Sequence, residues 1–206
     1  MELGVAYFLT HEYQLAFQHY EGFIRKHPHH ADIIYGMAGT ALWCLDQRLN
    51  AIQMWRDGLR CRYSDAAGGI SNLLMLYCAS IVDPSVEETT KIKQTLAVKI
   101  QDPRADTWPG PLARYVLGRI DEDRLQAECA DFNVGEAETR KVEVSFYNEL
   151  RKSYSHDPNH FVSEMRRISK MSWNDYLISK HVFFGKVWRP TFHLARHFAK
   201  HSALSW

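Results

Sequence analysis

The sequence predicts an all-α protein in which antiparallel helical hairpins stack on one another. Two observations support this fold class. A pattern of small and aromatic residues recurs after 35 residues, and Cys44, Cys61 and Cys78 are spaced by 17 residues, half of that period. In addition, no run of alternating apolar and polar residues lies between hairpin turns, so no sheet is expected. A period of this length is typical of repeated helix pairs.

The first helix pair is expected within residues 1–28. Its second helix carries apolar side chains at helical spacing, which places them on one face: Tyr13, Ala16, Phe17, Tyr20 and Phe23. One hairpin cannot bury such a face alone, so neighbouring hairpins must cover it. We expect the small residues, such as Gly4, where two helices approach closely, and the large aromatic residues in the space between helices.

The second pair repeats the first with a shift of 35 residues. Leu3, Gly4, Tyr7, Ala16, Tyr20 and Pro28 correspond to Ala38, Gly39, Leu42, Ala51, Trp55 and Tyr63. A further shift of the same length brings Leu73, Leu74 and Tyr77 onto the first three positions. The second helix of this third pair is expected over residues 86–100, where the small-then-aromatic pattern is not clear.

Turn residues divide the later half of the chain into further helices. Trp-Pro-Gly-Pro at 108–111 predicts a rigid turn before a short helix through Leu117, and Asp121 is expected to cap a helix that ends near residue 131. A break is expected at 156–159, and the remaining helices are expected over 136–154, 161–171, 175–187 and 191–203. We therefore expect three hairpins in residues 1–103 and degenerate hairpins in residues 104–206, packed together as one domain.

The spacing in the first pair resembles the tetratricopeptide repeat. Its pattern of L-G-x-x-Y, then A-x-x-x-Y, then P occurs as Leu3-Gly4, Tyr7, Ala16, Tyr20 and Pro28. The second pair has Tyr63 in place of the closing proline, and the third pair matches only in its first helix. Residues 108–120 are loosely similar to a spacer of some bacterial tetratricopeptide proteins. The resemblance implies a short superhelix whose first helices line a concave groove that binds protein.

Positions that line the groove in that family are mostly apolar in this chain. Carried over by position, they are Phe8, Leu9, Thr40, Trp43, Ser71 and Met75. An exposed Trp43 with Met75 and Phe8 would anchor a partner protein, because aromatic residues and methionine contribute strongly at interfaces. The alternative is that the C-terminal helices fold back and fill the groove. Adaptors for heat-shock chaperones need lysine and asparagine at these places, so that subfamily is not expected.

Catalytic signatures are lacking. The chain contains no GxxxxGK[ST], GxGxxG, GxSxG or HExxH motif, so we expect neither an enzyme nor a cofactor. His193, His197 and His201 would share one helix face, a geometry that can hold a divalent metal. No carboxylate lies in that segment and solvated histidines are common in terminal helices, so no metal site is predicted. A second histidine cluster lies at a hairpin end, where polar residues are expected in any case: His27, His29 and His30.

Charge is distributed unevenly, although the net charge is only +1. Residues 140–206 carry 12 Lys and Arg against 5 Asp and Glu, whereas residues 1–139 carry 13 against 19. A basic face that includes Arg166, Arg167 and Lys170 is therefore a second candidate for partner binding, unless other segments neutralise it. Its aromatic neighbours fall at helical core spacing and no nucleic-acid motif accompanies them, so nucleic acid is the less favoured partner.

No stretch of the sequence is long and apolar enough to span a bilayer and no signal peptide is evident, so we expect a cytoplasmic protein without a membrane partner. We interpret the chain as a non-enzymatic protein-binding module. The specific hypothesis, based on its size and simplicity, is a bacterial immunity protein that binds and neutralises one toxin. The alternative is a general adaptor that recruits a protease, a secretion component or an envelope component to its client. The sequence leaves the partner and the oligomeric state open.

Overall fold

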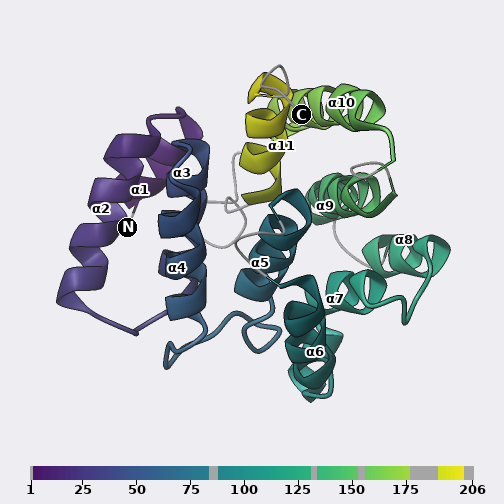
Figure 1. The fold of residues 1–206 in the computed structure, drawn as a ribbon, viewed down its shortest axis with the longest axis horizontal. Coiled ribbons are helices and arrows are strands. Elements are labelled where there is room, and N and C mark those ends of the chain that lie inside the picture. Colours follow the sequence, from purple (N-terminus) through teal and green to yellow (C-terminus); the bar gives the residue numbers. More distant parts are fainter. Residues whose placement is uncertain (1, 84–87, 131–133, 153–155, 177–189, 202–206) are drawn as a thin grey trace. The chain divides into compact units, whose positions relative to one another are not determined.

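A computed structural model of the chain describes residues 2–83, 88–130, 134–152, 156–176 and 190–201. These residues contain eleven α-helices, one 3-10 helix and no strand (Figure 1), which confirms the all-α prediction. The chain divides into two compact units, Met1–Leu117 and Gly118–Trp206. The first unit therefore extends beyond residue 103, where the sequence placed the boundary. That the two regions form one domain stays a prediction.

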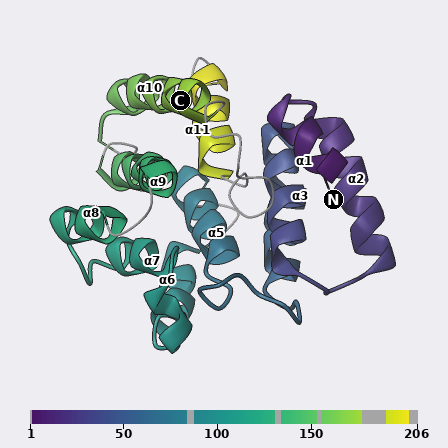
Figure 2. The same cartoon turned by 180° about the vertical axis from the view of Figure 1, so that it is seen from behind.

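The first unit contains the three expected helix pairs. They are α1 (Glu2–Leu9) with α2 (Tyr13–Lys26), α3 (Asp32–Cys44) with α4 (Arg48–Gly58), and α5 (Ser71–Val82) with α6 (Thr89–Lys99), followed by the short helices η1 (Pro103–Asp106) and α7 (Gly110–Val116). From α1 to α6, each helix packs against the next along the chain, and α3 also packs against α5. Figure 2 shows these helices from the side opposite to that of Figure 1.

Glycine lets the two helices of a pair approach closely, as the repeat pattern predicted. A Cβ atom added to Gly39 would lie 2.6 Å from Cδ1 of Trp55, and one added to Gly4 would lie 2.7 Å from Cε1 of Tyr20. Trp55 is 1% exposed and donates its indole N–H to the carbonyl of Gly36 at 3.2 Å. The glycine and the aromatic residue therefore occupy complementary space, which explains why both recur with one period.

The second unit consists of α8 (Glu122–Ala130), α9 (Val134–Lys152), α10 (Pro158–Tyr176) and α11 (Pro190–His201). The carboxylate of Asp121 accepts a hydrogen bond from the backbone N–H of Arg124 at 2.8 Å, which confirms the predicted cap. Asp157 caps α10 in the same way, through the N–H of His160 at 2.9 Å. Because Pro158 suits a first helical turn, α10 starts before residue 161, the predicted start. Most of the helix predicted over 175–187 lies outside the described residues.

Side chains of α9, α10 and α11 form the core of this unit. The ring centroid of Phe198 lies 6.4 Å from that of Phe146 and 5.6 Å from that of Phe161. On each helix, a row of buried apolar side chains is spaced by three or four positions, as an amphipathic helix requires. These rows include Val142, Phe146 and Leu150 on α9, Phe161, Met165 and Ile168 on α10, and Leu194 and Phe198 on α11.

Candidate functional site

Most side chains of the predicted groove are buried. The exposed fractions are 4% for Phe8, 0% for Thr40, 0% for Trp43 and 2% for Met75, whereas Leu9 and Ser71 are partly exposed. That partners bind along these positions stays a prediction, with Leu9 and Ser71 as the two residues that retain accessible surface.

Trp43 is a core residue in this structure and not the exposed anchor that the groove interpretation needs. Its ring centroid lies 5.5 Å from that of Trp55 on α4, and the guanidinium carbon of Arg48 lies 5.6 Å from its ring centroid. Because α3 packs against α2 and α5 as well as against α4, no part of the indole is accessible.

The basic face on α10 keeps part of its predicted charge accessible. Arg166 and Arg167 are both exposed. Nε of Arg167 lies 2.6 Å from Oε2 of Glu164, one turn earlier on the same helix. The side chain of Lys170 lies outside the described residues. Since Glu164 offsets the charge of Arg167, Arg166 is the stronger candidate for contact with an acidic partner.

Two histidines of the predicted row are packed side chains. His193 and His197 on α11 are 2% and 5% exposed, so the expectation of solvated histidines is wrong for this pair. The ring of His197 lies 5.9 Å from that of Phe198, which belongs to the core of the unit. The side chain of His201 lies outside the described residues. Within the described part of the chain, no group of three or more His, Cys, Asp or Glu residues could hold a metal ion.

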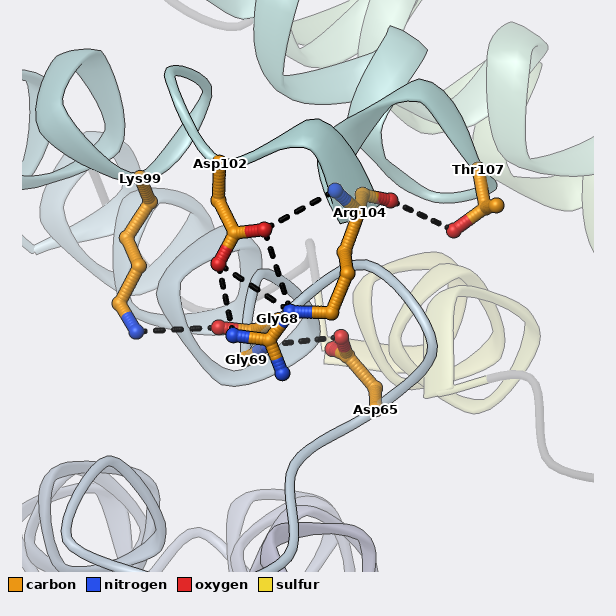
Figure 3. Close-up of polar contacts among 7 residues, drawn as sticks. All are labelled: Asp65, Gly68, Gly69, Lys99, Asp102, Arg104 and Thr107. Carbon is orange, nitrogen blue, oxygen red and sulfur yellow. Dashed lines mark hydrogen bonds and ion pairs between the residues drawn. The ribbon is translucent and has the colours of Figure 1, made fainter.

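A polar network that sequence reasoning missed joins the loop before α5 to the end of α6 (Figure 3). The carboxylate of Asp65 accepts the backbone N–H groups of Gly69 at 2.8 Å and of Ser71 at 2.7 Å, and the second bond satisfies the first N–H of α5. Nζ of Lys99 donates to the carbonyl of Gly68 at 3.0 Å. Both glycines have positive φ, 81° and 90°, a conformation that favours glycine.

An ion pair between Asp102 and Arg104 lies beside this turn (Figure 3). Nη2 of Arg104 lies 2.6 Å from Oδ2 of Asp102, and its backbone N–H donates to Oδ1 at 2.9 Å. The side-chain hydrogen bond from Arg104 is the main cause that lowers the pKa of Asp102 to about 2. A Cβ atom on Gly68 would lie 3.3 Å from both partners of the pair, so the turn and the ion pair pack tightly.

Asp32 supplies a buried carboxylate to the same loop. It is 4% exposed, and its Oδ2 accepts the backbone N–H of Asp65 at 3.0 Å. Burial raises the pKa of Asp32 from 3.8 to about 6; the hydrogen bond from Asp65 and the charge of Lys99 oppose the shift, and the carboxylate of Asp65 adds to it. A raised pKa is typical of catalytic carboxylates, but here the group bonds to backbone and holds the loop before α5, which indicates a structural role.

None of the described helices combines the length and the apolar character needed to cross a bilayer. Comparison of the chain with protein-family models, with curated proteins and with solved structures found no match. The tetratricopeptide interpretation therefore stays a prediction that rests on the sequence pattern.

Proposed function

We propose that the chain is a non-enzymatic protein-binding module built from stacked helical hairpins. The observation that supports the proposal best is the order of helix contacts in the first unit. Each helix from α1 to α6 packs on the next, and α3 packs on α5, so the first helices of two successive pairs are neighbours. Repeats that contact only their neighbours offer an extended surface to a partner. A fold alone does not define a function, so the partner must be found by experiment.

Within this class, the specific proposal is a bacterial immunity protein that acts in the cytoplasm by binding one toxin and blocking it. An inhibitor of this kind needs no chemistry of its own, and a chain of 206 residues provides ample surface for an interface of standard size. Such a protein should bind a single partner tightly, whereas an adaptor should bind several partners with modest affinity.

Affinity capture from the native organism at moderate salt tests this proposal. We expect the wild-type chain to retain one dominant protein in stoichiometric amount from a nuclease-treated lysate, and expression of the chain to protect cells from that protein. A variant carrying Arg166→Glu and Arg167→Glu, run beside it, tests whether the basic face contributes. Several weakly held proteins would favour the adaptor. Retention of no protein, or of nucleic acid alone from an untreated lysate, would contradict the proposal.

A further inference from the structure

The loop before α3 and the loop after α4 are joined through their backbones. The N–H of Arg62 donates to the carbonyl of His29 at 2.8 Å, and the N–H of Tyr63 donates to the carbonyl of His30 at 3.0 Å. The N–H of Asp32 returns a bond to the carbonyl of Tyr63, also at 3.0 Å. These bonds form a short parallel ladder. Side chains that are far apart in the sequence are thereby held next to one another.

Exposed rings line this ladder. The ring centroid of His30 lies 5.0 Å from that of Tyr63 and 6.1 Å from that of His27. His29 stacks on Tyr35, with centroids 6.0 Å apart and an interplanar angle of 4°. The side chain of Tyr63 is 52% exposed, and all three histidines are exposed. Rigidly held aromatic rings lose little conformational entropy on binding, so they suit an interface.

Cationic side chains surround the rings. The guanidinium carbon of Arg62 lies 5.4 Å from the ring centroid of Tyr63, and Lys26 is exposed at the end of α2. Arg25 pairs with Glu21 on its own helix at 3.0 Å, and Arg60, just after α4, pairs with Asp57 at the end of that helix at 3.3 Å. Among the described residues, no carboxylate pairs in this way with Lys26 or Arg62. Lys26 and Arg62 are therefore the cations of this area that can reach a partner, since the carboxylate of Asp32 beside the ladder is buried and accepts the backbone N–H of Asp65.

We propose that this area docks an acidic segment of the protein partner. We call it the histidine–tyrosine surface and define it as Lys26, His27, His29, His30, Arg62 and Tyr63. The inference rests on the proposed function and adds the surface and the chemistry that the partner must have. Carboxylates of the segment pair with Lys26 and Arg62, and its apolar side chains lie on the ring of Tyr63. Arginine and tyrosine are, with tryptophan, the residue types enriched among those that contribute most at protein interfaces.

A single-stranded nucleic acid fits this surface less well. Proteins that bind single strands follow several phosphates along a positively charged groove, and each neutralised phosphate adds to the affinity. Here two of the four cations, Arg25 and Arg60, are already held by carboxylates. Exposed apolar side chains also flank the two loops in the sequence, Ile33 at 40% and Leu59 at 37% exposure. A mixture of apolar, aromatic and arginine side chains is typical of protein interfaces.

Binding of a defined peptide to the full chain tests the inference. The probe is a fluorescently labelled peptide in which pairs of glutamates alternate with leucines, followed by anisotropy at low salt; a peptide with glutamine for glutamate and an oligothymidylate serve as comparisons. We expect Arg62→Glu to weaken binding of the acidic peptide about tenfold. Lys91→Glu, at an exposed lysine of α6 in the same unit, is the matched control and should leave binding unchanged.

Three results would overturn the inference: equal binding of the glutamine peptide, equal loss in the Arg62→Glu and Lys91→Glu variants, or tighter binding of the oligothymidylate. Circular dichroism verifies that each variant is folded. Affinity capture from the lysate with the Arg62→Glu variant as bait tests the docking surface separately from the proposed function. A partner retained equally by wild type and variant would overturn the docking surface and leave the protein-binding function standing. A wild-type chain that binds the acidic peptide but captures no protein would overturn the proposed function, and only the affinity of this surface for acidic peptides would remain.

Discussion

Replacement of Trp55 by alanine is expected to lower the free energy of unfolding by about 3–5 kcal/mol. The indole of Trp55 fills the space between α3 and α4, beside Trp43 and opposite Gly39, and it bonds to the carbonyl of Gly36. Its removal leaves a cavity, while the carbonyl of Gly36 still accepts the hydroxyl of Thr40 at 2.9 Å. Urea unfolding followed by far-UV circular dichroism measures the loss. Leu49→Ala, on the same helix and 68% exposed in the wild type, should change the free energy by less than about 0.5 kcal/mol.

A double-mutant cycle with Gly39→Ala tests the same packing independently. In the wild type the added Cβ meets the indole of Trp55, so this change should cost about 1–3 kcal/mol. In the Trp55→Ala background the space is vacant, and alanine should be neutral or stabilising because it favours a helix over glycine. Additive losses in the double variant would show that the two residues do not pack together.

Replacement of Asp32 by asparagine is expected to remove a pH dependence of stability. Because burial raises the pKa of Asp32 in the folded chain to about 6, above its usual value of 3.8, the folded state binds a proton between these values while the unfolded state does not. The contribution of this group to stability therefore falls as pH rises from about 4 to about 6. Between pH 7 and pH 5, the free energy of unfolding of the wild type should rise by about 1.4 kcal/mol relative to that of Asp32→Asn.

Asparagine is the informative replacement because its side-chain oxygen can still accept the N–H of Asp65. Urea unfolding of both proteins across this pH range gives the difference. Glu12→Gln, at an exposed carboxylate of the same unit, is the control, and its free energy of unfolding should change with pH as that of the wild type does. If the free energies of unfolding of wild type and Asp32→Asn differ by the same amount at every pH, the carboxylate is not buried as described. If the stability of the wild type relative to Asp32→Asn falls on acidification, the pKa of Asp32 is lowered in the folded state, which contradicts the prediction.

Local spacing was sufficient to predict the helical pairs. Gly4 packs against Tyr20, and Gly39 packs against Trp55, so each contact lies within one hairpin. Because every hairpin needs the same contact, the two residue types recur in the sequence with the period of the repeat. The cap of α8 could be predicted for the same reason, because Asp121 bonds to a backbone group three residues away. Both features depend on short segments of chain.

The buried state of Trp43 could have been read from the composition of its helix. Residues 33–43 of α3 carry no charge and are apolar on every side, a pattern typical of a helix covered all round. Every residue of α3 from Ile34 to Trp43 is accordingly buried. The family resemblance assigned an open face to this helix, and the composition argued against that assignment.

The hydrogen-bond network around Asp65 could not be predicted from residue spacing alone. Its bonds join Asp32, Asp65 and Lys99, which are separated by about a repeat length, and most of them run from a side chain to backbone. A partial signal was present, since Asp65 precedes a glycine pair and the start of α5. That order predicts a cap and a turn, but it does not identify Asp32 or Lys99 as the residues that secure the turn.

Hydrogen–deuterium exchange of the chain, free and bound to its captured protein, tests the central claim most directly. That claim is that the first unit holds a protein through surfaces at the ends of its helical hairpins. We predict slower exchange on binding in residues 26–31 and 60–64, where the two loops form the backbone ladder. Unchanged exchange throughout residues 2–117 of the bound chain would contradict the account.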